Sequence, residues 1–266
     1  MALGVGVPFM LQKTRESGVT YLLDDLSSTP DSLISPSKAF SASFETAAII
    51  RLRRTSDGAE SDFTGADIGS GADLTWVGAQ TSFVRYVYDQ SGNSKHLGQA
   101  TASYQGQYTD ASGNKIAMDD GNPAPQQIPT GMTYPALGFT GSDGAAVFRF
   151  NGNSDAGWKL LRNGGAHLIE ISGVVASPVS GVGTPVIKVN GVTLSPYTRA
   201  EALSEMQNTD VTVRVTDIDW SANGNWPVIV PYLTYFGNAK MSSVALYNAE
   251  PSSADLDLIV TAFETT

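Results

Sequence analysis

Phe83–Leu97 reads FVRYVYDQSGNSKHL and is the segment that says most about the fold. Its first half alternates in the manner of a β-strand, so Phe83, Arg85 and Val87 are expected on one face of a sheet and the intervening residues on the other. The residues of Asp89–Asn93 then supply the Asp, Ser, Gly and Asn that favour turns. The pattern predicts a strand that ends in a polar turn.

The sequence of this turn, and that of a segment before it, resemble those of a known family. Tyr88–Asn93 reads YDQSGN and is followed shortly by His96-Leu97, while Ile50–Gly58 reads IRLRRTSDG, a strand that enters a Ser-Asp-Gly turn. These motifs resemble those of the catalytic domain of fungal α-L-arabinofuranosidase B, and similar stretches occur in bacteriophage structural proteins. The likeness covers about residues 36 to 100 and becomes a general similarity to concanavalin-A-like domains beyond them. The resemblance implies a concanavalin-A-like β-sandwich.

The composition agrees with an all-β fold. The chain has 266 residues, 27 of them glycine, and only 16% are charged. Short runs of Val, Thr, Tyr and Phe between turn residues are typical of strands joined by tight turns, and one sandwich can reach this length. We therefore expect an N-terminal arm over residues 1–35 and one jelly-roll sandwich over residues 36–266, closed by a short C-terminal helix.

Charge and cysteine content limit the partners and the compartment. The formal net charge is −10 and the isoelectric point is about 4.5, which argues against a nucleic-acid partner. The chain has no cysteine, whereas the fungal relatives implied by the resemblance contain several. The absence of cysteine is typical of folding in a reducing cytoplasm.

Local patterns predict several elements. In Thr46–Arg53, alternation places Ala48, Ile50 and Leu52 inside and Ile49, Arg51 and Arg53 outside. Further expected elements are a strand over Ala166–Val175, a hairpin over Val186–Leu194 that turns at Asn190-Gly191, a short helix over Arg199–Gln207, strands over Val211–Thr216 and Met241–Tyr247, and a closing helix capped by Ser252 or Ser253 that buries Leu256, Ile259, Val260 and Phe263.

The catalytic residues that the resemblance implies are a Glu nucleophile and an Asp acid/base. Gly165–Glu170 is similar to the family's motif around the nucleophile, but the glutamate is displaced by one residue. A displacement of one residue in a strand turns the side chain to the opposite face. Glu170 is thus a weak candidate. Val230–Gly237 stands where the family has its acid/base, and it contains no carboxylate. We expect the fold without the hydrolase chemistry.

No cofactor and no metal site is predicted. The two histidines, His96 and His167, have no Gly-x-Ser-x-Gly motif to accompany them. The acidic pairs Asp119-Asp120 and Asp217/Asp219 could bind calcium through loop oxygens, but their spacing matches no calcium-loop motif. Isolated acidic turns are the ordinary interpretation.

A loop bracketed by two tryptophans is the candidate ligand surface. Trp220–Trp226 reads WSANGNW, and Trp220, Asn223, Asn225 and Trp226 could contact a host-surface glycan through ring stacking and amide hydrogen bonds. The alternative is that the rings fill the sandwich core, because aromatic side chains contribute much burial energy.

The N-terminal arm is the candidate assembly segment. Residues 1–12 are apolar, flexible at Gly4 and Gly6, and too short to build a core of their own. Phe9, Met10 and Leu11 are therefore expected to anchor the chain on another subunit. The alternative is an edge strand of the sandwich itself. This apolar run is interrupted by glycine and proline, so neither a signal peptide nor a membrane span is predicted.

Together, the resemblance, the absence of cysteine and the arm predict a bacteriophage virion protein that folds in the host cytoplasm. A tail position, in a fibre, spike or baseplate, is the first hypothesis. Other virion proteins and further copies of the chain would then be its partners. A capsid decoration protein and a retaining arabinofuranosidase-like glycoside hydrolase are the alternatives, and the hydrolase would need Glu170 together with a second carboxylate.

Overall fold

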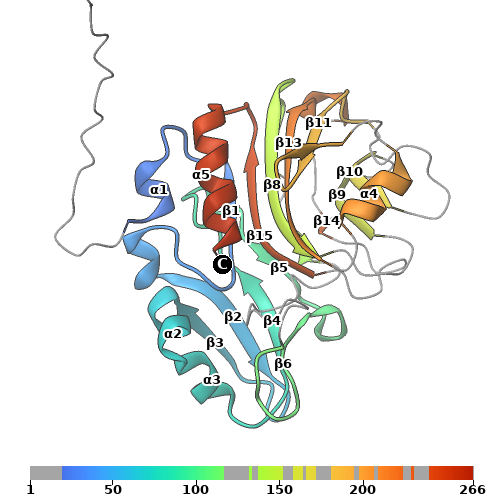
Figure 1. The fold of residues 1–266 in the computed structure, drawn as a ribbon. Coiled ribbons are helices and arrows are strands. Elements are labelled where there is room, and N and C mark those ends of the chain that lie inside the picture. Colours follow the sequence, from blue (N-terminus) through green and yellow to red (C-terminus); the bar gives the residue numbers. More distant parts are fainter. Residues whose placement is uncertain are drawn as a thin grey trace, which may run out of the picture.

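The computed structural model of the chain describes residues 20–116, 132–133, 137–151, 158–163, 166–171, 181–194, 198–206, 209–223, 229–230 and 240–265. Two antiparallel sheets pack face to face and form a β-sandwich with a C-terminal helix on its outside (Figure 1). The predicted fold class is confirmed.

The first sheet contains the three longest strands that the structure describes. Its strands lie in the order β1 (Ser32–Ile34), β15 (Lys240–Tyr247), β8 (Gly144–Asn151), β13 (Asp210–Ile218), β11 (Val186–Val189) and β12 (Val192–Thr193). Neighbouring strands are antiparallel throughout.

The second sheet contains the stretch from which the fold was predicted. Its strands lie in the order β10 (Ala166–Ile171), β9 (Trp158–Asn163), β14 (Ile229–Val230), β7 (Met132–Thr133), β5 (Leu97–Gly98), β4 (Ser82–Val87), β2 (Ala48–Arg54) and β3 (Glu60–Thr64), and β6 (Gln107–Thr109) pairs with β4.

The helices lie around the edges and on one outer face (Figure 1). They are α1 (Leu22–Asp25), α2 (Gly65–Ser70), α3 (Ala72–Val77), α4 (Arg199–Met206) and α5 (Ser253–Glu264). Helix α5 packs against β8 and β13 with α1 beside it, α2 follows β3, and α4 lies against β10. Among the described residues, no helix has the length and apolar character needed to cross a membrane.

Strand β8 explains why the sandwich has a helix on its outside. Ala146, Phe148 and Phe150 point into the main core between the sheets. Ala145 and Val147 point the other way, into a second core beneath α5. Because successive side chains of a strand alternate between faces, a strand with apolar residues on both faces has to be covered on both sides.

Two predictions that depended on local signals are confirmed. Asn190 and Gly191 both have positive φ, 47° and 81°, as the hairpin turn between β11 and β12 requires. The hydroxyl of Ser252 accepts a hydrogen bond from the Asp255 amide (3.1 Å) and caps α5. The helix buries Leu256, Ile259 and Phe263 as expected, with Val260 partly buried.

The predicted alternation of β2 is correct only in part. Ile50 and Leu52 are buried as expected, but Ile49 is also fully buried and Ala48 is only half-buried. A register shift in the pairing with β3 falls between Ala48 and Ile50. Such a bulge adds a residue to one strand, so the strict two-residue period is lost at this point.

The same correction applies to β4. Val84 and Val87 are both buried in the main core, although alternation predicts opposite faces for them. Consecutive residues of β2 pair with residues of β4 that are two apart: Arg51 pairs with Tyr86, and Leu52 pairs with Val84. Arg85 is the extra residue of this irregularity, and the strand changes parity there.

The packed structure begins before residue 36, where the sequence placed the start of the sandwich. Ser32–Ile34 pair with β15, and Leu33 and Ile34 are fully buried. The segment from α1 to β1 is therefore part of the sandwich rather than of an arm. The predicted anchors Phe9, Met10 and Leu11 lie outside the described residues.

Candidate functional site

The polar turn that carries the resemblance holds distant parts of the chain together. Asp89 is buried, and its Oδ1 accepts hydrogen bonds from the amides of Leu33 (2.9 Å) and Ser91 (3.0 Å). Its Oδ2 accepts from the Ser91 hydroxyl (2.7 Å) and the Lys95 amide (2.9 Å). Four donors of the chain thus occupy a carboxylate that has about four acceptor positions, and none is left for a ligand.

Gln90 extends this connection. Its Oε1 accepts from the Phe40 amide (2.8 Å), and its Nε2 donates to the carbonyls of Ser35 (3.2 Å) and Lys38 (2.9 Å). Its backbone amide donates to Leu33 O (2.7 Å). Since Gln90 is buried, these bonds satisfy polar groups that water does not reach.

His96 takes part in the same connection and not in a catalytic pair. The Asp89 amide donates to its Nδ1 (2.9 Å), so the proton of the neutral ring belongs on Nε2. The ring lies edge-on to Tyr88, with centroids 5.2 Å apart and planes at 77°. Because the Asp89 carboxylate is occupied by other donors, no Asp–His pair forms here.

The outer face of β2, β3 and β4 is polar but is neutralised by its own side chains. The Nε and Nη2 of Arg51 donate to the two carboxylate oxygens of Asp62, each at 2.7 Å, and the Tyr88 hydroxyl donates to Asp62 Oδ1 (2.7 Å). The Arg51 hydrogen bond holds the pKa of Asp62 below its ordinary value, while burial and Asp62 raise the pKa of Tyr88. Arg51 is therefore not available as an anion-binding group.

The remaining arginines of this region also have partners. Arg53 donates to Gln105 Oε1 (2.6 Å), Arg54 pairs with Asp57, and Arg85 lies 3.5 Å from Glu60. The guanidinium groups of Arg51 and Arg85 lie over the Tyr86 ring at 5.6 and 4.5 Å from its centroid. This face behaves as a set of paired strand charges, which is the ordinary interpretation of such residues.

Glu170 lies on β10, where it is opposite Lys159 of β9. Its neighbours Leu168 and Ile169 are both fully buried, so β10 is covered on both faces at this point. The side chain of Glu170 is not among those that the structure describes. The segment that stands in the family's acid/base position, residues 231–237, also lies outside the described residues.

The ring of Trp220 is not available to a ligand, which corrects its assignment to the ligand surface. The side chain is fully buried, and its Nε1 donates to the Tyr247 carbonyl (2.8 Å). Gly144 makes room for it, because a Cβ at that position would lie 1.9 Å from Nε1. Trp220 therefore fills the core, as the alternative interpretation held.

The other residues of that loop keep the status of predictions. Asn223 ends the 3₁₀ turn Trp220–Asn223, and its side chain is not described. Asn225 and Trp226 lie outside the described residues. A glycan contact would have to use these three residues without Trp220.

A buried charge cluster anchors the loop after β6. Asp73 of α3 is fully buried, Lys115 Nζ lies 3.0 Å from its Oδ2, and the Tyr108 hydroxyl donates to the same oxygen. Burial, and then Asp73, raise the pKa of Tyr108 well above its usual value. Asp73 Oδ1 has no hydrogen-bond partner among the described residues. The cluster connects Lys115 to α3. Removal of one partner of such a buried ion pair strongly destabilises the folded state.

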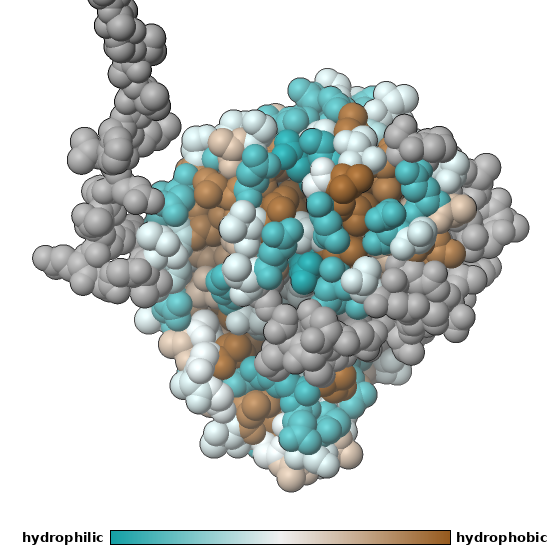
Figure 2. Space-filling model, viewed as in Figure 1, coloured by the Kyte–Doolittle hydropathy of each residue, from teal (hydrophilic) through white to brown (hydrophobic). Residues whose placement is uncertain are grey.

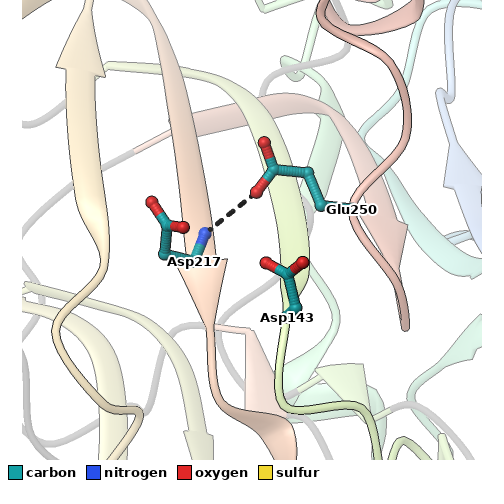
Figure 3. Close-up of side chains that lie close together, drawn as sticks. All are labelled: Asp143, Asp217 and Glu250. Carbon is teal, nitrogen blue, oxygen red and sulfur yellow. Dashed lines mark hydrogen bonds between the residues drawn. The ribbon is translucent and has the colours of Figure 1, made fainter.

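Three carboxylates that the sequence did not group together meet at one end of the first sheet. Asp143, Asp217 and Glu250 place oxygens within 4.8 Å of one another, and the Asp217 amide donates to Glu250 Oε2 at 3.2 Å (Figure 3). Asp217 has a positive φ of 58°. Within the described residues, no basic side chain forms an ion pair with these three. Two of them are exposed, and exposed acidic groups of this kind are common without a metal ion.

Of these acidic residues, the sequence singled out only Asp217. Its assumed partner, Asp219, instead accepts hydrogen bonds from the amide and hydroxyl of Ser221 (3.0 and 2.6 Å). Asp143 and Glu250 are far from Asp217 in the sequence, and only the pairing of β8 with β13 and β15 brings them together. No local signal marks such a set.

The last feature is a groove of about 410 Å³ on the outside of the sandwich, between α1 and α5. Its lining includes Thr20 and Leu22 from the start of the described chain, and Leu258 and Ala262 from α5. No local sequence pattern marks this groove, because it forms between segments that lie far apart in the chain.

Two antiparallel sheets and an outer helix define the fold of the chain as a concanavalin-A-like β-sandwich. One comparison with a solved structure agrees on the fold. The chain resembles a GH54 α-L-arabinofuranosidase soaked with a cyclic sulfate inhibitor, with 16% identity, a TM-score of 0.50, and coverage of 88% of this chain and 62% of that chain. A mutant of a GH54 α-L-arabinofuranosidase soaked with 4-nitrophenyl α-L-arabinofuranoside gives 16% identity, the same coverage of both chains and a TM-score of 0.49.

The similarity has clear bounds. The chain spans less than two thirds of the length of these arabinofuranosidases. At this identity the likeness concerns the fold alone. No family model matches the chain, and no curated protein matches it.

Proposed function

We propose that this chain is a non-catalytic structural protein of a bacteriophage virion, associated with the tail as part of a fibre, spike or baseplate. The observation that supports a non-catalytic role is the occupation of Asp89 and Gln90. These residues belong to the motif that resembles the arabinofuranosidase family. Their polar side-chain atoms form hydrogen bonds with other groups of the same chain. These two residues of the similar segment therefore build the fold and offer no free polar group to a substrate.

The virion assignment is supported by the sequence. Tyr88–Asn93 resembles segments of bacteriophage structural proteins, and a chain of 266 residues without cysteine suits folding in a reducing cytoplasm. A capsid decoration protein shares all of these features and is the alternative position within the same particle.

Immunogold electron microscopy of purified particles, with an antibody raised against the chain, tests this proposal. Label along the tail or at its tip is the expected result. Label distributed over the head contradicts the tail position in favour of a decoration protein. Particles without label, from a preparation in which a known capsid protein is labelled, contradict the virion assignment itself.

A glycoside hydrolase is the second candidate, and the fold similarity to a GH54 α-L-arabinofuranosidase is the observation that favours it. A retaining mechanism needs two carboxyl groups roughly 5 Å apart, and Glu170 is the one candidate from the sequence. Turnover of an aryl α-L-arabinofuranoside that is lost in Glu170→Gln, but kept in the exposed control Glu264→Gln, would overturn the non-catalytic proposal. We expect no turnover by the unmodified chain.

A further inference from the structure

The groove between α1 and α5 has apolar residues at its floor. Phe40 and Ala39 are buried at its floor, and Phe40 packs on Phe263 of α5 with ring centroids 5.7 Å apart. Leu258 contributes a side chain that is 40% exposed. Figure 2 shows hydrophobic surface among hydrophilic residues over the same two helices. A volume of about 410 Å³ is in the range of pockets that bury small ligands or a few side chains.

The edge of the groove is charged. Asp25 of α1 and Glu45 contribute carboxylates, and Lys38 donates from its Nζ to the Thr265 hydroxyl (3.1 Å). Burial lowers the pKa of Lys38. An apolar floor with a polar edge is the arrangement that protein-binding surfaces use.

The chain itself contains a segment that suits this groove. Thr20, where the described structure begins, is one of the residues that line the groove. The preceding sequence has an uncharged apolar run, residues 3–11, which ends in Phe9-Met10-Leu11. Residues 13–16 follow with two basic side chains, Lys13 and Arg15, and one acidic side chain. The apolar run matches the floor, and the basic residues match the carboxylates at the edge.

We infer that the groove between α1 and α5 binds residues 3–11 of a neighbouring copy of this chain, with Phe9, Met10 and Leu11 as anchors. The inference rests on the proposed function, since a subunit of a repetitive assembly needs a contact that passes from copy to copy. The segment and the groove are different surfaces of the same chain, so the contact is heterologous and can be repeated along a ring or filament. With a net charge of −10 per copy, apolar burial also has to offset repulsion between copies.

Analytical ultracentrifugation of the full chain over a range of concentrations tests the inference. We expect reversible association that is weakened at least tenfold by Leu258→Lys and by Thr261→Arg, because each places a charge in an apolar contact. Both residues are exposed on α5, and far-UV circular dichroism checks that the variants fold. Val186→Lys is the matched control, because Val186 has the same 40% exposure on β11, and it should associate like the unmodified chain.

A second arm of the experiment identifies the segment. Deletion of residues 1–12 should leave a folded chain that no longer associates, and a synthetic peptide of residues 1–12 should bind this deletion variant but not its Leu258→Lys form. Association that is unchanged in Leu258→Lys and Thr261→Arg overturns the inference. The inference is also overturned if the chain stays monomeric and the groove variants alter the rate at which residues 1–12 are proteolysed. That result would mean that the segment binds the groove of its own chain. Particle labelling is independent of both results and decides the proposed function separately.

Discussion

At the scale of single residues, Asp89 shows how a family-like word can be structural. It combines an Asx-type turn, in which the Ser91 amide and hydroxyl donate to its carboxylate, with a bond from Leu33 in another part of the chain. The turn half of this arrangement is visible in the sequence, because Asp, Ser, Gly and Asn occur together. The Leu33 half is not visible, because it depends on a contact between residues 56 positions apart.

We predict that Asp89→Ala lowers the free energy of unfolding by on the order of 3 kcal/mol, since it leaves several buried donors without an acceptor. Urea denaturation followed by circular dichroism measures the change. Asp110→Ala is the control, because Asp110 accepts from the Ser112 and Asn114 amides in a similar turn but is in contact with water, which can replace it. If both variants lose the same free energy of unfolding, then burial of the hydrogen bonds of Asp89 contributes nothing to stability.

The candidate site residues were harder to predict than the fold. The Asn- and Gly-rich loop around Trp220 predicts a ligand surface, but Gly144 leaves a space in the core that receives the ring. The glycine and the tryptophan are 76 positions apart, and neither signals the other in the sequence. The Asp143, Asp217 and Glu250 cluster was missed for the same reason.

At the scale of elements, local signals predicted well where a single segment determines its own geometry. The Asn190-Gly191 hairpin and the Ser252-capped α5 both have their decisive residues within a few positions of each other. Strands β2 and β4 were predicted as strands, but their inward faces were not, because a bulge arises from the pairing of two strands and has no signature in either alone.

Helix α5 has a polar connection to the start of the sandwich as well as an apolar face. Asp255 in its first turn accepts from the amide (2.8 Å) and the hydroxyl (2.6 Å) of Ser27, which follows α1. Burial alone would raise the pKa of Asp255, but the hydrogen bonds from Ser27 outweigh it and hold the pKa below its ordinary value. The ionised form is therefore favoured by folding.

This shift predicts a pH dependence whose sign follows from linkage. A carboxyl group with a lower pKa in the folded state contributes stability that is fully present above its ordinary pKa of about 4 and is lost as the pH falls towards the folded value. We predict that Asp255→Asn destabilises by about 1 kcal/mol at neutral pH and flattens the fall in melting temperature between about pH 5 and pH 3. Asp257→Asn, an exposed position on the same helix, should keep the steeper fall. Identical pH profiles for the two variants would contradict the assignment to Asp255.

At the scale of the whole molecule, the two cores share one sheet. Phe148 of β8 belongs to the main core and its neighbour Val147 to the core beneath α5, so neither core can open without moving the same strand. Strand β15 connects them in the same way, with Val244 on one side and Ala245 on the other. The sandwich and its outer helix should therefore unfold as one cooperative unit.

Phe263→Ala tests this coupling, because Phe263 is fully buried beneath α5 and outside the main core. Removal of a buried Phe costs about 3–5 kcal/mol, and a chain of this size loses roughly 2–4 °C in melting temperature per kcal/mol. If the molecule is one unit, far-UV circular dichroism and tryptophan fluorescence, to which Trp220 in the main core contributes, should report the same lowered melting temperature. Phe148→Ala, on the other side of β8, should also lower the melting temperature by the same amount in both measurements. An early loss of helix signal in Phe263→Ala, with the fluorescence transition unchanged, would show instead that α5 unfolds separately and that the sandwich does not need it.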